Sequence, residues 1–213
     1  RTMDVEVMAY SESSKQTTIR RGDGQVFTVP ISMFDENSQK QIIEIAPAPK
    51  ASLAARLSVG KRRERKEDSS YMKIQTLTGQ VVIQNKTLKI DFKGKGSAFL
   101  VARQTARYKN REEDYGKILA REDFDINVAG GKEFRFECEP IKTEYDSDRD
   151  DSNIGGWEYY GWLLIIQDSD GEVYLADTSI GNLKTEIEES ELYAEQLLSL
   201  QKDQQVEKNL QSR

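Results

Sequence analysis

The sequence predicts a mainly β protein, in which a small β module is followed by an antiparallel β-sandwich and a C-terminal helix. Apolar and polar residues alternate in many short segments, which is the pattern of half-buried strands. Glycine-, asparagine- and aspartate-containing turn signals separate these segments. Apolar residues recur at helical spacing only in a short stretch after Asp35 and again from about Asn182 onward.

The first module is predicted to contain a β-hairpin. Apolar residues alternate with polar ones on both sides of a Gly-Asp-Gly turn at residues 22–24. Pro30 closes the second strand, because proline has no N–H to donate to a ladder. The alternating positions are Val5, Val7, Ala9, Thr17, Ile19, Phe27, Val29 and Ile31.

A short helix is predicted after this hairpin. Asp35 is a good N-cap, and Glu36 complements the helix dipole in the first turn. The Pro-Ala-Pro sequence at residues 47–49 ends the helix and begins a linker. We therefore expect a module at residues 1–47, a linker at 48–52, a β-sandwich at 53–180, and a helix with a tail at 181–213.

The first module resembles the Sla homology domain, an SH3-like module first described in an endocytic adaptor. The resemblance rests on Arg-Thr-Met at residues 1–3, the hairpin, and the segment 27–39, which reads Phe-Thr-Val-Pro-Ile-Ser-Met-Phe-Asp-Glu-Asn-Ser-Gln. The sequence departs from the family pattern at three positions: Met3 replaces tryptophan, Asp35 replaces a capping serine, and Ser38 replaces aspartate.

The resemblance implies an SH3-like barrel and a peptide or protein partner. In the adaptor, the module binds an Asn-Pro-Phe-x-Asp peptide. The aromatic residues that the resemblance places nearest a binding groove are Tyr10, Phe27 and Phe34.

The second domain is predicted to be a sandwich of antiparallel sheets, because short strand patterns follow one another with turn signals between them. Turns are expected at Thr78–Gly79, at residues 93–96 and at Gly130–Gly131. The expected strands are residues 53–65, 71–76, 80–84, 87–93, 97–108, 117–128, 133–143, 157–167 and 172–178. The last hairpin, at residues 160–173, resembles one found in bacterial proteins that carry the same N-terminal module.

Four aromatic residues lie together at Trp157, Tyr159, Tyr160 and Trp162. Strict alternation sends Tyr160 and Trp162 to one face of a strand and Trp157 and Tyr159 to the other. One pair is expected in the core, and the other, Trp157 and Tyr159, is a candidate stacking platform for a sugar or a peptide.

Composition excludes several classes of function. The chain of 213 residues carries a formal net charge of -6, so it has no general attraction for nucleic acid or for anionic membrane surfaces. No apolar run approaches the roughly 20 residues that a spanning helix needs. The sequence contains no histidine, which removes Ser-His-Asp and Cys-His schemes and most zinc sites. The single Cys138 is expected to be a buried hydrophobe.

Two charged runs are further candidates. Asp146, Asp148 and Asp150 alternate like the start of a calcium loop, but Asp151 stands where such a loop needs glycine, and a solvated loop is the favoured alternative. The basic run at residues 61–66 is interpreted as a charged edge strand, with an anionic partner as the alternative.

The sequence therefore predicts a non-enzymatic binding or scaffold protein with a protein or peptide partner and no cofactor. The alternatives are a structural component of a cell envelope and a carbohydrate-binding or carbohydrate-active protein using paired carboxylates. Because the chain starts with Arg1, it is expected to be a processed form or a fragment, secreted, periplasmic or in the cell envelope, with a cytoplasmic location as the alternative. The oligomeric state and the ligand do not follow from the sequence.

Overall fold

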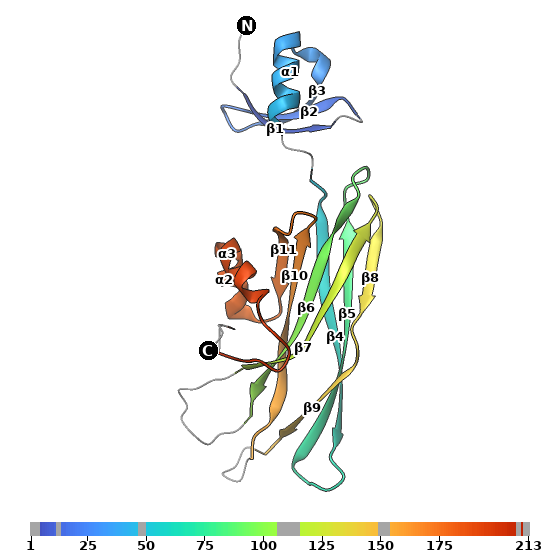
Figure 1. The fold of residues 1–213 in the computed structure, drawn as a ribbon, viewed down its shortest axis with the longest axis vertical. Coiled ribbons are helices and arrows are strands. Elements are labelled where there is room, and N and C mark those ends of the chain that lie inside the picture. Colours follow the sequence, from blue (N-terminus) through green and yellow to red (C-terminus); the bar gives the residue numbers. More distant parts are fainter. Residues whose placement is uncertain are drawn as a thin grey trace. The chain divides into compact units, whose positions relative to one another are not determined.

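The computed structural model of the chain confirms the mainly β architecture with antiparallel sheets (Figure 1). It describes residues 5–11, 14–46, 50–105, 116–148, 154–207 and 210, with only the backbone of Glu188 and Glu191. The chain divides into two compact units, Arg1–Ala51 and Ser52–Arg213. No helix within the described ranges has the length and apolar character needed to cross a lipid bilayer.

The smaller unit is a three-stranded antiparallel sheet with a short helix. The strands lie in the order β1-β2-β3. Their bounds are β1 Val5–Ser11, β2 Gln16–Arg21 and β3 Val26–Pro30, and they are followed by the 3-10 turn η1 (Ile31–Met33) and the helix α1 (Glu36–Ile45). The Asp35 side chain accepts hydrogen bonds from the N–H groups of Asn37 and Ser38, which confirms the predicted N-cap. The predicted hairpin is β2–β3, with Gly24 at φ 84° in its turn.

The larger unit contains two packed antiparallel sheets. The five-stranded sheet has the order β11-β10-β6-β7-β12. Its strands are β6 Phe92–Gln104, β7 Gly116–Val128, β10 Trp157–Asp168, β11 Val173–Thr178 and β12 Gln205–Val206. In the other sheet, β5 (Met72–Asn85) pairs with β4 (Leu53–Arg65) on one side and with β8 (Glu133–Glu137) and β9 (Ile141–Asp146) on the other.

Two of the three glycine-based turn predictions in this unit are wrong, while the turn at Gly130–Gly131 is confirmed. Thr78 and Gly79 lie within the continuous strand β5, and residues 93–96 lie within β6 instead of forming a turn. Residues 87–91 form no strand, so the predicted strand 87–93 is wrong. The glycines within these strands let neighbouring side chains lie close to the backbone. A Cβ on Gly79 would lie 2.9 Å from Cys138 Sγ, and a Cβ on Gly96 would lie 2.3 Å from the Phe124 ring.

The predicted strand at residues 133–143 is broken in two. β8 pairs with residues 80–84 of β5, and β9 pairs with residues 72–77 of the same strand. Figure 1 shows β8 and β9 one after the other along β5. The break falls at residues 138–140, where Pro140 lacks a backbone donor.

The five-stranded sheet is buried on both faces. Leu163, Leu164, Ile165 and Ile166 on β10 are all 0% exposed, which explains why their apolar run has no alternation. One face packs against the other sheet, and the second face is covered by α2 (Gly181–Glu189) and α3 (Glu191–Leu197), as Figure 1 shows. The core under the helices consists of Phe99, Val101, Ile118, Leu163, Ile165, Ile180, Leu183, Leu197, Leu200, Val206 and Leu210.

The predicted C-terminal helix is two short helices, separated at Ser190. The Ser190 side chain accepts a hydrogen bond from the Tyr193 N–H and so caps α3. The described part of the tail after Lys202 lies on the sheet, because β12 pairs with β7 and both Val206 and Leu210 are buried. The burial of Val206 and Leu210, two apolar side chains in an otherwise polar tail, holds this segment against the larger unit.

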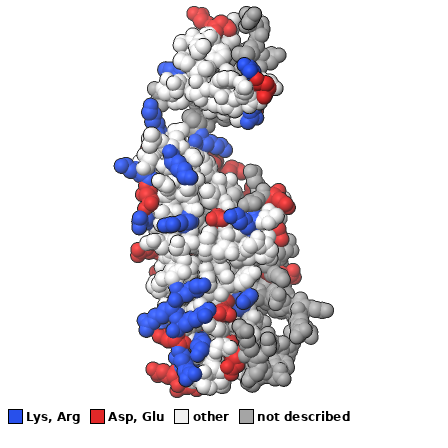
Figure 2. Space-filling view, turned by 180° about the vertical axis from the view of Figure 1, so that it is seen from behind, with Lys and Arg blue, Asp and Glu red and all other residues white. Residues whose placement is uncertain are grey.

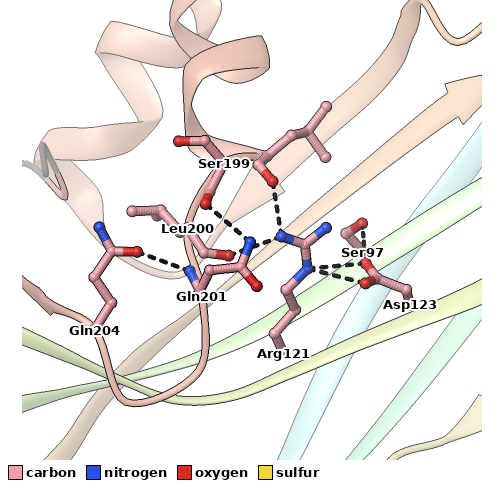
Figure 3. A network of polar contacts seen from close by, with 8 residues as sticks. Ser97, Arg121, Asp123, Ser199, Leu200, Gln201 and Gln204 are labelled. Carbon is pink, nitrogen blue, oxygen red and sulfur yellow. Dashed lines mark hydrogen bonds and ion pairs between the residues drawn. The ribbon is translucent and has the colours of Figure 1, made fainter.

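Arg121 on β7 holds this segment against the sheet (Figure 3). Its Nη1 donates to the carbonyl oxygens of Leu198 and Leu200, each at 2.8 Å, and its Nε donates to Asp123 at 2.9 Å. Asp123 also accepts a hydrogen bond from Ser97 Oγ at 2.6 Å. Residues that follow α3 are thus anchored by a charged side chain from the middle of the chain.

Cys138 is expected to be unreactive in the folded protein. It is 7% exposed, and burial raises its thiol pKa to about 11. We expect a disulfide reagent at about pH 8 to modify the native chain far more slowly than the urea-unfolded chain. Because the folded pKa is raised, stability is retained below pH 9 and falls as the pH rises toward 11. Equal modification rates in the native and unfolded chain would contradict this assignment.

Candidate functional site

The structure places the N-terminal candidates Tyr10, Phe27 and Phe34 at separate positions of the smaller unit. Tyr10 pairs with Thr17 and Phe27 pairs with Ile19, so both rings project from the same face of the sheet as the buried Ile19, but they lie on its two outer strands. Phe27 is 39% exposed, and the Arg21 guanidinium lies 5.5 Å from its ring centre. Phe34 follows η1 and is partly buried.

The outer edge of β3 offers backbone groups to solvent. Arg21 N–H donates to Gln25 O and Ile31 N–H donates to Lys15 O, each at 2.9 Å. In an antiparallel pair, every second residue directs its backbone N–H and C=O groups toward the neighbouring strand, and the residues between direct theirs away from it. Gln25 and Ile31 bond toward β2, so Val26 and Thr28 direct their backbone groups away from β2. The Val26 side chain is 55% exposed. β3 is an outer strand of this sheet, and the main strand contacts of α1 are with β1, the other outer strand.

A bulge changes the predicted arrangement of the β10 aromatic residues. Tyr159 lies opposite Ala102 and Trp162 lies opposite Leu100, so Tyr160 is an extra residue and the alternation shifts there. Tyr159 and Trp162 therefore share one face, and the predicted separation of Tyr159 from Trp162 is wrong.

Trp157 and Tyr159 have different surroundings. Tyr159 packs inside the sandwich: Lys61 Nζ lies 5.2 Å from its ring centre, and burial raises its pKa to about 12. Trp157 is half-buried and lines an open cavity of about 510 Å³ between β9, β7 and the segment that precedes β12. A ligand-binding role stays a prediction for both residues, and only Trp157 adjoins this cavity.

The wall of this Trp157 cavity combines apolar residues, lysines and two acidic residues, Glu144 and Asp203. Leu119 and Ile141 line it together with Trp157, while Lys142 and Lys202 stand at its exposed rim. A volume of this size falls within the range that small-ligand pockets usually have.

Irregularities in two strands contribute to the lining of the Trp157 cavity. Leu119 is the extra residue of a bulge in β7, and β9 begins directly after the break at Pro140. Bulges are frequent beside binding sites because they re-aim side chains. The bulge at Tyr160 in β10 lies three residues from Trp157 and outside the lining.

A buried polar group lies behind this wall. The Thr143 hydroxyl, on the cavity wall, donates to Trp157 O at 2.6 Å, and its cross-strand partner is Gln75. Gln75 is 0% exposed, and its Oε1 accepts a hydrogen bond from the Tyr159 N–H. Within the part of the chain that the structure describes, Gln75 Nε2 has no hydrogen-bond partner.

The charges at the Trp157 cavity do not cancel one another. Lys117 Nζ lies 2.7 Å from Asp203 Oδ1, and this ion pair lowers the pKa of Asp203. Glu144 is paired with Lys66 at 2.6 Å. Among the described residues, Lys142 and Lys202 form no ion pair, although the charge of Lys202 also helps to lower the pKa of Asp203. With Lys117 paired to Asp203 and Glu144 paired to Lys66, the rim keeps a net positive charge.

The acidic run is organised by Asp146, which is 2% exposed at the end of β9. Its carboxylate accepts hydrogen bonds from the N–H groups of Asp148 and Ile154, at 2.9 and 2.8 Å. Asp150 lies outside the described residues, so calcium binding by Asp146, Asp148 and Asp150 stays a prediction. The described ranges contain no cluster of three candidate metal ligands.

The basic run lies on β4, which is an outer strand of its sheet. Arg63 forms an ion pair with Glu158 at 2.9 Å, and Arg62 lies 3.5 Å from Glu64. Figure 2 shows basic side chains gathered near the end of the larger unit where the β4–β5 hairpin lies, with acidic side chains among them. These contacts agree with a charged edge strand.

Sequence reasoning found Trp157 but missed Leu119, Lys142 and Lys202. These residues lie far apart along the chain, and none of them belongs to a motif. The only local signal was Pro140, which marks the break before β9 and precedes Lys142 by two positions.

The chain matches no protein-family model. No curated protein matches it either. Among solved structures, it is similar to a β-glucosidase from Kluyveromyces marxianus in complex with glucose, with 10% identity, a TM-score of 0.27, and coverage of 60% of this chain and 13% of that one. A protein from Akkermansia muciniphila matches with 12% identity, a TM-score of 0.30, and coverage of 62% and 72%. A β-D-glucoside glucohydrolase from Trichoderma reesei matches with 12% identity, a TM-score of 0.26, and coverage of 81% and 25%. The chain thus spans 13% of the length of the first of these proteins.

Proposed function

We propose that this chain is a non-enzymatic binding protein whose smaller unit recognises an extended segment of a protein partner. The observation that carries this proposal is the open outer edge of β3. Val26 and Thr28 present backbone donors and acceptors there, and the side chains of Val26 and Phe27 are 55% and 39% exposed beside them. An extended peptide satisfies such groups by adding a strand to the sheet.

The sequence supports a binding role over catalysis. The chain has no histidine to act as a general base near neutral pH. The resemblance of residues 1–47 to the Sla homology domain adds support for a peptide partner.

The register of the added strand follows from the same geometry. Pro30, at the end of β3, has no N–H, so the peptide has Val26 and Thr28 as its only donors along this strand. Arg21 lies beside Phe27, but it is ion-paired with Asp23, so the edge carries no net positive charge there that would select an acidic peptide.

The proposal is tested by selecting peptides from a random library on the whole chain and measuring their binding to two variants. Thr28→Pro removes an outward N–H but no backbone hydrogen bond to β2, and proline is tolerated on outer strands. It also removes the Thr28 hydroxyl, which lies 3.2 Å from the Thr18 hydroxyl on β2. The control variant must therefore lose that hydroxyl as well. We expect Thr28→Pro to weaken the selected peptides by about tenfold or more, because it removes one backbone hydrogen bond and blocks the strand from pairing.

The matched control is Thr28→Ala, which keeps the backbone N–H and is expected to bind nearly as well as the parent chain. Failure to select any peptide, or equal affinity of Thr28→Pro and Thr28→Ala, would refute strand addition at β3. Backbone amide signals of β1 and β2 report whether the smaller unit stays folded in both variants.

A further inference from the structure

We infer that the Trp157 cavity of the larger unit binds an acidic sugar residue of a polysaccharide. This role is independent of the peptide site proposed for the smaller unit. The inference rests on an indole, two apolar neighbours, two lysines that form no ion pair among the described residues, and an open rim.

The indole of Trp157 supplies a surface for a sugar ring. Aromatic side chains provide large apolar contact areas, and the apolar face of a pyranose packs well on them. Trp157 is held in place because its carbonyl oxygen accepts the Thr143 hydroxyl at 2.6 Å. Leu119 and Ile141 complete the apolar part of the wall.

The cations at the rim select for a carboxylate. Lys142 on β9 and Lys202 before β12 line the cavity and form no ion pair among the described residues. Lys117 and Asp203 neutralise each other at 2.7 Å, so they contribute no net charge. A carboxylate between Lys142 and Lys202 would form charge-assisted hydrogen bonds, which are stronger than those between neutral groups.

The open rim favours a residue within a chain over a small free acid. Pro140, Lys142 and Lys202 are exposed at the border of the cavity, so neighbouring sugars can continue into solvent. Because the net charge of the whole chain is -6, general attraction does not explain binding of a polyanion, and recognition must come from these local cations.

The test is calorimetric titration of the whole chain with a tetrasaccharide of alternating glucuronate and N-acetylglucosamine, with its carboxyl-reduced form, and with free glucuronate. We expect the tetrasaccharide to bind, and both carboxyl reduction and the Lys142→Gln/Lys202→Gln double variant to weaken binding by about tenfold or more. Trp157→Ala is expected to abolish binding, while Trp157→Phe keeps an aromatic ring and retains most of it.

The matched control is Lys93→Gln/Lys184→Gln, which removes the same charge from exposed positions outside the cavity and is expected to leave binding unchanged. Absence of tetrasaccharide binding, equal binding of the carboxyl-reduced form, or an equal loss in the control variant would overturn the inference. Equal affinity for free glucuronate would overturn the assignment to a polysaccharide. Urea unfolding of each variant shows whether a loss of binding is a loss of folding.

Discussion

Replacing Gly94 with alanine is expected to destabilise the larger unit by about 3 kcal/mol, near the upper end of the range for overpacked positions. A Cβ at this position would lie 2.0 Å from the backbone oxygen of Gln167 and 3.0 Å from two atoms of the Phe92 ring. Gln167 belongs to β10, the neighbouring strand, so the clash involves backbone that cannot rotate away. The pairing of β6 with β10 must therefore distort.

Tryptophan fluorescence during urea unfolding measures this effect selectively. Both tryptophans of the chain, Trp157 and Trp162, lie on β10, so their signal reports the larger unit alone. Gly181→Ala is the matched control, since a Cβ there would meet no atom within 4 Å. We expect that control to be neutral or slightly stabilising. A Gly94→Ala chain that unfolds at the same urea concentration as the parent would contradict the predicted contact.

Replacing Arg121 with alanine is expected to cost about 2–4 kcal/mol, because two carbonyl groups and one carboxylate lose a charged donor. The side chain is 19% exposed, and its guanidinium also lies 5.5 Å from the Phe99 ring centre. The carbonyl oxygens of Leu198 and Leu200 would be left without this donor in the network of Figure 3.

In Arg121→Ala, the C-terminal segment is expected to detach from the sheet more readily than the larger unit unfolds as a whole. Ile118 N–H donates to Gln204 O, and Asp203 N–H donates to Ile118 O, so these amides report whether the C-terminal segment stays on the sheet. In Arg121→Ala, we expect faster hydrogen exchange at these amides than in the parent chain. Arg135→Ala is the matched control, because this side chain is 64% exposed and pairs with Glu133 on its own strand. That control is expected to change stability by less than about 0.5 kcal/mol. Equal effects of the two substitutions would show that Arg121 does not anchor the segment.

The fold was predictable where a strand or helix pattern in the sequence coincides with the burial and hydrogen bonds found in the folded chain. The strand at residues 53–65 is found with the same bounds, and the cap at Asp35 forms the predicted hydrogen bonds. The prediction was wrong at Gly79, Gly94 and Gly96, because glycine in a turn and glycine under a neighbouring strand look alike in a sequence. Only the packing of Cys138, Gln167 and Phe124 against them distinguishes the two cases.

The candidate sites were predictable only in part. Trp157 stood out by its residue type, and the outer position of β4 was indicated by its charges. Leu119, Lys142 and Lys202 carried no signal, since their proximity depends on a bulge, a strand break and the return of the tail to β7. A bulge shifts the alternation by one residue, and no local preference in the sequence marks where that happens.

By itself, the sequence determined that this protein is mainly β and that the usual histidine-based chemistry is absent from it. These properties follow from residue types and from periodicity, both of which are local. The tertiary structure decided which apolar residues of the polar tail are buried, which glycines allow strands to approach, and which lysines stand beside Trp157. Those outcomes depend on contacts between distant segments, and such contacts exist only when the chain is folded.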